Sequence, residues 1–412
     1  MAIQTLPPMP ALKTSTAGKP EVPKWVPPPT TQEDLPWQDL RTLDMSLLDG
    51  TPEQQAHLVE TCRQAIQLDG FLYLSNFGVT EEQMQRNFDL AQYCLMGGGI
   101  SEEEKERLKW DPSTGSFIGY KPRIGWGEKG KKGPDQIEHF NWYESNFNDD
   151  TLVPQRMKPF MDEIMAYAGS VEPLTTAAIA HSLQHMHNEV NARLLVLFSR
   201  ILGLPDNYLW EHVNTKGGIL GETSYHRYQV YHPFEIKDVQ DATLIMHGHT
   251  DYGTTTIIPS QPITCLQMLG NDDVWRYVKY EPHRLLVNLG DALEVVSGGH
   301  FKATRHKVVK PPKDQLQYPR VALISFNHAQ KDLPLRPLEN APLILEKGLN
   351  KDSDVFGAFC RRLDEGLETP TFGEWKSLRF QGAQAPPDKI VLVSGVKHKE
   401  QVFNGTKVLM PI

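Results

Sequence analysis

The sequence predicts a mainly β protein with flanking helices, built around a jelly-roll core. Between residues 223 and 326 a series of short segments reads as strands, because each is rich in β-branched and aromatic residues and turn residues separate them: SYHRYQVYHP, ATLIMHGHTD, TTTIIPS, ITCLQML, WRYVKY, RLLVNLGD, HKVVK and RVALISF. Short, closely spaced strands are typical of a closed or double-sheet all-β body. Helical patterns precede this region, and no internal repeat is visible.

Four regions follow one another along the chain. Residues 1–36 form a proline-rich arm with few bulky apolar residues, which is expected to be extended or disordered. Residues 37–215 form a mixed, largely helical region. Residues 216–332 hold the jelly-roll core, and residues 333–412 form a C-terminal extension expected to pack on that core.

Helix signals lie in the second region. Capping boxes occur at 51–54 (TPEQ) and 80–83 (TEEQ), and Gly70 is placed to end the first helix. Between them FLYLSNFGV reads as a short strand. A longer helix, from about 173 to 202, is expected to brace the sheet.

That longer helix carries His181 and His185 four residues apart, a spacing that can bind zinc. The metalloprotease pattern HExxH needs Glu directly after the first His, and Ser182 stands there instead. The two histidines are therefore expected to be ordinary residues of a helix face rather than ligands of a zinc hydrolase.

Composition excludes several classes of protein. A net charge of −9 disfavours general nucleic-acid binding. There is no run of 18 apolar residues to span a membrane, and the first residues lack the pattern of a secretion signal. Scattered cysteines without CxxC spacing are expected to be reduced thiols: Cys62, Cys94, Cys265 and Cys360. The expected location is the cytoplasm, and the sequence leaves the oligomeric state open.

Three residues in the strand segments can form a metal site. His249 and Asp251 are two positions apart in LIMHGHTDYG, so on a strand both would point to one face. His306, in GGHFKATRHKVV, would complete the set from a later strand. Two imidazoles and one carboxylate leave positions open on an octahedral Fe(II), as oxygen-activating non-haem iron enzymes require. An HxD pair alone is usually without metal, and by parity His247 offers a different pair with His249.

The order of the motifs resembles the 2-oxoglutarate/Fe(II)-dependent oxygenase superfamily. HTDYG is followed by an apolar strand, then CLQML, NLGDALEVVSGGHFKATRH and PRVALISF, while GFLYLSNFG upstream matches the family's GFFYLxNHG. The resemblance covers most of residues 36–332. It is closest to the branch of isopenicillin N synthase, plant flavonoid and gibberellin oxygenases and fungal secondary-metabolite oxygenases. It implies a double-stranded β-helix that binds Fe(II), 2-oxoglutarate and O2, with His249, Asp251 and His306 as the ligands.

The resemblance also implies an arginine that binds the distal carboxylate of 2-oxoglutarate, on the strand after the second histidine. Arg320 is the matching residue, and a guanidinium fork suits a carboxylate. The family's serine two positions later is replaced by Ala322. Ser325 points to the opposite face by strand parity, so it cannot substitute.

A tyrosine of the family's YP motif is expected to assist this arginine. In YHP the aligned residue is His232, with Tyr231 one position earlier, and a one-residue change of register decides between them. Tyr228 shares the face of His232 by parity and is a further candidate donor.

The resemblance implies that a small organic molecule is oxidised, by hydroxylation, desaturation or ring rearrangement, in secondary metabolism. Candidate substrate contacts are residues expected at the mouth of the core, each of which could equally be a packing residue: Phe117, Tyr120, Arg123, Trp126, Phe326 and His328. Two alternatives stay open. One is an Fe(II) oxidase of the same fold that uses no 2-oxoglutarate, and the other is a non-catalytic jelly-roll binding protein.

Overall fold

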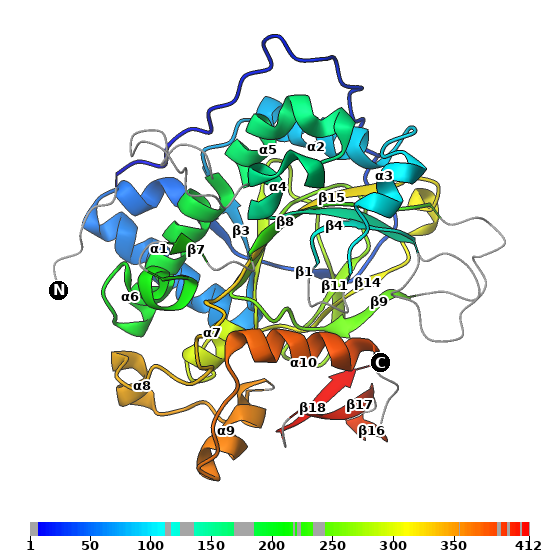
Figure 1. Ribbon diagram of the computed structural model, residues 1–412. Helices are drawn as coiled ribbons and strands as arrows, with labels where there is room; N and C mark the ends of the chain where they lie inside the picture. Colours follow the sequence, from blue (N-terminus) through cyan, green and yellow to red (C-terminus); the bar gives the residue numbers. More distant parts are fainter. Residues whose placement is uncertain are drawn as a thin grey trace.

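Two β-sheets face each other at the centre of the molecule, with helices around them, in a computed structural model of the chain (Figure 1). The structure describes residues 7–111, 117–123, 136–168, 185–216, 219–220, 224–233, 244–353, 355–384, 389–393, 396–403 and 406–411. Side chains from both sheets share the space between them: Ile324 of one sheet and Val308 of the other belong to one buried cluster. The prediction of a mainly β fold with flanking helices and a jelly-roll core is confirmed.

Each strand segment expected from the sequence contains an observed strand. Within the described residues, the larger sheet has eight strands. Their spatial order is β2 (Thr42–Asp44), β3 (Phe71–Ser75), β13 (Leu285–Leu289), β10 (Thr255–Pro259), β15 (Arg320–Asn327), β8 (Tyr225–Tyr231), β5 (Ile137–Trp142) and β4 (Gly119–Lys121). The smaller sheet has the order β1 (Trp37–Gln38), β12 (Trp275–Val278), β11 (Leu266–Leu269), β14 (His306–Val309) and β9 (Leu244–His249). Two short strands, β6 (Thr215–Lys216) and β7 (Ile219–Leu220), pair separately.

Helices of the N-terminal half cover the outer face of the larger sheet. They are α1 (Pro52–Gln64) with its continuation η2 (Ala65–Asp69), α2 (Glu81–Leu95), α3 (Glu102–Arg107), α4 (Glu144–Asn148), α5 (Met161–Ala168) and α6 (Ala192–Leu202). The predicted capping boxes are confirmed at Thr51 and Thr80. Gly70 ends the first helix in the left-handed conformation, with φ of 62°. Among these helices α2 packs directly on β8 and β15.

The long helix expected at 173–202 is observed over its second half, as η7 (His185–Asn191) followed by α6. Residues 169–184, including His181, lie outside the described residues. His185 is buried, and its Nε2 contacts the carbonyl oxygen of Phe77. It is therefore held as a packing residue of the helix face.

The described part of the N-terminal arm, residues 7–36, has no helix or strand and lies along α2 and α5 (Figure 1). Its main attachment is Trp25, whose ring stacks on Phe88 with centroids 4.3 Å apart. The backbone N–H of Trp25 donates to Asp89 Oδ1 at 2.7 Å. These contacts hold an extended segment on a helix without a core of its own.

The C-terminal extension adds helices and a small sheet beside the jelly roll. After α7 (Asp291–Val296) of the core come α8 (Pro342–Lys347), α9 (Phe356–Asp364), α10 (Phe372–Gln384), and the three-stranded sheet of β16 (Lys389–Val393), β17 (Val396–Phe403) and β18 (Thr406–Pro411). Helix α10 crosses beneath the end of β9 (Figure 1). None of the helices in the described ranges is long and apolar enough to cross a membrane.

One buried carboxylate joins this extension to the core. Glu294 of α7 accepts hydrogen bonds from the backbone N–H groups of Val355 and Phe356, both at 3.0 Å, and from the N–H of Ala303 at 2.6 Å. The Ser353 hydroxyl also donates to it. Burial raises the pKa of Glu294 from its usual value near 4.5 to about 7, although these donors oppose the shift.

Replacing Glu294 with alanine should lower the free energy of unfolding by several kcal/mol, since each buried donor left without a partner costs roughly 1–3 kcal/mol. Glu294→Gln keeps an acceptor oxygen and should lose less. Because the folded pKa is raised, the group's contribution is largest below about pH 4.5 and falls as the pH rises towards 7. Denaturant unfolding across this range tests both effects, with exposed Glu346→Ala as the control. An unchanged stability in Glu294→Ala would contradict the prediction.

Candidate active site

The side chains of His249, Asp251 and His306 converge, and a ligand atom of each lies within 4.8 Å of the other two. Asp251 Oδ1 is 3.8 Å from His249 Nε2 and 3.9 Å from His306 Nε2. In the antiparallel pairing of β9 and β14, His249 and His306 stand directly opposite each other. Two imidazole nitrogens and one carboxylate oxygen form a donor set that fits Fe(II).

The local structure differs from the expectation in one respect. His249 is the last residue of β9, and Asp251 lies in the turn that follows, not two positions along the same strand. The two side chains meet because the turn brings Asp251 back, and strand parity alone does not explain their proximity. The side chain of His247 lies outside the described part of the structure.

Two neighbouring strands orient the Asp251 carboxylate. Its Oδ2 accepts hydrogen bonds from Thr256 Oγ1 at 2.6 Å and from Asn288 Nδ2 at 2.8 Å, which leaves Oδ1 directed at the histidines. Burial alone would raise the pKa of Asp251, but His306, His249 and these two hydrogen bonds lower it to about 2. The carboxylate is thus charged and aimed before any metal arrives.

His306 is held by its other ring nitrogen. Nδ1 lies 3.1 Å from the carbonyl oxygen of Thr304, so the N–H is placed on Nδ1 and the lone pair on Nε2. The ring of Phe71 packs edge-on against the imidazole, with centroids 5.6 Å apart. This tautomer is the one required for binding a metal through Nε2.

Arg320 lies buried beside a small cavity between the sheets. The cavity is lined by Tyr231, His232, Pro233, Ile263, Cys265, Pro311, Leu316, Tyr318 and Arg320. The Arg320 guanidinium stacks 4.8 Å from the Tyr231 ring, and these two residues are direct partners in the pairing of β15 with β8. In the described part of the chain no carboxylate pairs with Arg320, and its Nε lacks a hydrogen-bond partner. A buried guanidinium at a cavity, with no carboxylate partner in the described residues, fits a ligand carboxylate.

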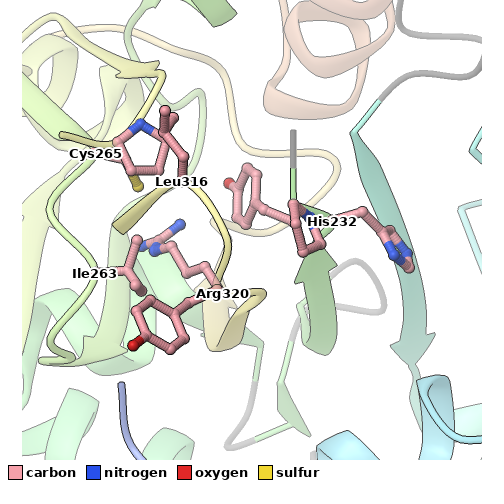
Figure 2. Close-up of a pocket in the computed structure, with 9 residues that line it drawn as sticks. His232, Ile263, Cys265, Leu316 and Arg320 are labelled. Atoms are coloured by element: carbon pink, nitrogen blue, oxygen red, sulfur yellow. The ribbon is translucent and has the colours of Figure 1, made fainter. Parts of the chain in front are cut away.

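The two neighbouring candidates for the assisting donor are placed differently. The Arg320 guanidinium lies over the Tyr231 ring. The His232 ring points away from Arg320 (Figure 2). His232 Nε2 instead contacts Glu138 Oε2 at 2.8 Å. Tyr228 is also corrected: it belongs to the opposite face of β8, where its ring packs against Trp142 in the core beneath the helices.

The missing serine leaves an apolar position on the inner face. Ala322 stands opposite Gln229 of β8, two positions from Arg320 on the same side of the strand. Ser325 points to the other face, as expected, and its hydroxyl lies 3.0 Å from His226 Nδ1. No hydroxyl from β15 therefore replaces the family's serine, and the side chain nearest to its place across the sheet is Gln229.

Phe117, Phe326 and His328 lie in or beside an aromatic cluster at one end of the core. Phe117 belongs to this cluster with Trp110, Tyr143 and Tyr225, and Phe326 packs against it. The His328 ring lies 5.6 Å from that of Tyr225. These three candidates thus lie on one aromatic wall.

Among the other substrate candidates, Tyr120 is not brought to this wall. Tyr120 faces away from the space between the sheets, and its hydroxyl donates to Glu138 Oε1 at 2.6 Å. Arg123 lies close enough to influence the pKa of Tyr120. Trp126 lies outside the described residues. Of these candidates, Phe117 lies on the aromatic wall and Tyr120 lies on the other side of the sheet.

Sequence reasoning missed Arg227, which lies on the inner face of β8 two positions after Tyr225 and two before Gln229. Its Nε donates to Asn141 Oδ1 at 2.8 Å, and its Nη2 donates to the Tyr225 hydroxyl at 3.2 Å. The guanidinium also lies 5.0 Å from the Phe326 ring centroid. The alternation of YHRYQVY could have indicated it, once Tyr231 was known to face inward.

Two family models match parts of the chain. Residues 224–329, which hold His249, Asp251, His306 and Arg320, match the family model of the 2OG-Fe(II) oxygenase superfamily. Residues 40–161 match the model described as non-haem dioxygenase in morphine synthesis N-terminal. The chain belongs to the 2OG-Fe(II) oxygenase superfamily.

This oxygenase resembles proteins of plants and fungi. It is 26% identical over 311 residues to Jasmonate-induced oxygenase 4 of Arabidopsis thaliana, a match that covers 75% of this chain and 78% of that protein. It is also 26% identical over 337 residues to the 2-oxoglutarate-dependent dioxygenase frbH of Dothideomycetidae sp. (strain 11243), over 79% of this chain and 92% of that one.

Solved structures share the fold of the oxygenase. A full-length Neurospora crassa protein in complex with alpha-KG aligns with a TM-score of 0.61 at 17% identity, over 83% of this chain and 95% of that one. JOX2 in complex with 2OG, Fe and JA aligns with a TM-score of 0.51 at 23% identity, over 74% of this chain and 80% of that one.

Proposed function

We propose that this oxygenase oxidises a small organic molecule at Fe(II) held by His249, Asp251 and His306, with 2-oxoglutarate anchored by Arg320. The observation that carries the proposal is the convergence of these three ligand atoms in a chain of this family. When bound, the metal with 2-oxoglutarate and O2 supplies the oxidation of a C–H bond, while 2-oxoglutarate is decarboxylated to succinate and CO2. Hydroxylation, desaturation and ring rearrangement are all outcomes of this chemistry.

The protein's own residues supply position and environment. Thr256 and Asn288 aim the Asp251 carboxylate, and the Thr304 carbonyl sets the His306 tautomer. Arg320 offers a preorganised charge to the distal carboxylate of 2-oxoglutarate. The apolar lining around it excludes water and strengthens that pairing.

The half-buried Arg227 indicates that the substrate carries an anionic group. Its hydrogen bonds in the described part of the chain all go to neutral oxygens, those of Asn141, Gln229 and Tyr225. It also shares a sheet face with the metal site, because Thr256 pairs with Phe326, which pairs with Tyr225, two positions away. The charges of Fe(II), Asp251, Arg320 and the two carboxylates of 2-oxoglutarate sum to zero. The positive charge of Arg227 is not included in this sum, and a substrate carboxylate would neutralise it.

The substrate is therefore proposed to combine a carboxylate, bound by Arg227, with an apolar part that packs on Phe326 and Tyr225. Replacing Arg227 with methionine should raise the KM for such an acid by about tenfold or more, since charge-assisted pairs contribute roughly 1.5–3 kcal/mol. The KM for 2-oxoglutarate should stay near its original value. Steady-state kinetics with each substrate varied in turn measures both, and Arg276→Met, remote and paired with Asp272, is the control. Equal KM values for the acid in both variants would contradict the assignment.

Substrate-stimulated release of succinate tests the reaction class. Purified protein with Fe(II) and labelled 2-oxoglutarate is screened against pools of small organic acids, neutral small molecules, peptides and nucleotides. We expect iron-dependent succinate release, stimulated by small molecules and strongest with acids. Stimulation by peptides alone would contradict the proposed substrate class. Oxidation of a substrate with iron but without succinate would instead identify an oxidase that uses no 2-oxoglutarate.

A role in secondary metabolism and a cytoplasmic location belong to the same proposal. Similarity to the fungal dioxygenase frbH supports the first. The second is supported by the four cysteines, which are all buried and free. Fractionation of the source cells and the metabolite profile of a deletion strain test them separately.

A further inference from the structure

The C-terminal helix α10 reaches the turn that carries the metal ligands. Thr250, between His249 and Asp251, is buried, and both of its oxygens accept hydrogen bonds from Arg379 of α10. Arg379 Nη2 donates to the Thr250 carbonyl oxygen at 2.9 Å, and Nη1 donates to Thr250 Oγ1 at 3.2 Å. Arg379 lies beyond both segments that match the family models, which end at residues 161 and 329.

The same guanidinium also binds Asp291, a second residue that contacts the turn. Arg379 Nη1 forms an ion pair with the Asp291 carboxylate, which also accepts a hydrogen bond from Trp375 Nε1 at 3.0 Å. The backbone N–H of Asp291 in turn donates to the carbonyl oxygen of Asp251 at 2.7 Å. Arg379 therefore contacts the turn directly, through its hydrogen bonds to Thr250. It also contacts the turn indirectly, because its ion-pair partner Asp291 donates a backbone hydrogen bond to Asp251.

These contacts are buried. Arg379 is 8% exposed and Asp291 is fully buried. An ion pair out of contact with water is costly to break, because the remaining charge has no alternative partner. The turn lies beyond the end of β9, which ends at His249, so the ladder of β9 with β14 does not hold it. Its conformation depends on what surrounds it.

We infer that Arg379 is a positioning residue of the metal centre: it holds the His249–Asp251 turn in the conformation that binds the metal. The C-terminal extension is then a part of the metal site rather than an appendage. This inference rests on the proposed iron site. It predicts that loss of Arg379 weakens metal binding even where the jelly roll stays folded.

The test is metal binding by the full-length apoprotein. Titration with Fe(II) under anaerobic conditions, and with Co(II) followed by its visible absorption, gives the dissociation constant without any turnover. In Arg379→Met the dissociation constant should rise about 10- to 100-fold, the range found when residues that orient metal ligands are changed. The Co(II) spectrum should also change, because the ligands are less well placed. Trp375→Phe, which keeps an aromatic ring but removes the hydrogen bond to Asp291, should have a smaller effect.

Controls separate this role from general destabilisation. Arg276→Met makes the same chemical change on β12, away from the turn, and should bind metal as the original protein does. Adding methylguanidinium to Arg379→Ala should restore part of the affinity, since it refills the guanidinium position. If Arg379→Met is folded in the far- and near-UV circular dichroism and binds Co(II) with unchanged affinity and spectrum, the inference is wrong. If the original protein binds no Fe(II), the proposed function itself fails.

Discussion

Asp251→Ala should abolish iron-dependent turnover of 2-oxoglutarate. Asp251 is the one anionic ligand in the donor set, and it stands between two imidazoles at 3.8 and 3.9 Å. Its removal leaves two neutral nitrogens, so Fe(II) affinity should fall by more than the roughly 10- to 100-fold lost when a supporting residue is changed. Anaerobic Fe(II) titration together with succinate release measures both effects.

The fold should tolerate this substitution. Without metal, the alanine variant loses the contacts of the carboxylate with the two imidazoles and the hydrogen bonds from Thr256 and Asn288. Exposed Asp34→Ala is a control for the loss of a carboxylate. A fully active Asp251→Ala protein would show that the metal site is elsewhere.

Arg320→Met should raise the apparent KM for 2-oxoglutarate by tens- to thousands-fold, with Fe(II) binding retained. The guanidinium is buried, stacks on Tyr231 and has no carboxylate partner in the described part of the chain. Losing one member of a buried, charged pair costs roughly 2–5 kcal/mol, which corresponds to that range. Kinetics with 2-oxoglutarate varied at saturating iron provides the measurement.

Two further variants sharpen this result. Arg320→Lys keeps the charge but loses the planar fork, and should be intermediate. His232→Phe removes the side chain that points away to Glu138, and should leave the KM for 2-oxoglutarate near its original value. A large effect in His232→Phe and none in Arg320→Met would reverse the assignment of the two residues.

The sequence predicts the fold well because its signals are local. Strand segments, capping boxes and Gly70 act within a few residues, and each appears where it is expected. The histidines of the metal site could be found from the motif order. The placement of Asp251 could not be derived from parity, because the turn after His249 depends on contacts from Asp291 and Arg379, far away in the chain.

Register explains where the candidate residues around Arg320 lie. Alternation along β8 places four side chains on the inner face: Tyr225, Arg227, Gln229 and Tyr231. Alignment of the YHP motif with the family instead favours the face that carries Tyr228 and His232. A one-residue shift moves every side chain to the opposite face, so Tyr228 and His232 both face away from Arg320. The pairing of β8 with β15, in which Arg320 stands opposite Tyr231, fixes the register, and strand pairing over such a distance leaves no local signal in the sequence.

The contacts of Arg379 with the His249–Asp251 turn also imply an order in which folding and metal binding occur during synthesis. The ribosome completes the His249–Asp251 turn and His306 well before it reaches residue 379. N-terminal parts of a chain generally fold first, so the jelly roll can form around ligands that are present but not yet locked. Iron would be bound more tightly once α10 docks. Chains that have not reached residue 379 would then hold the metal more weakly than finished molecules do.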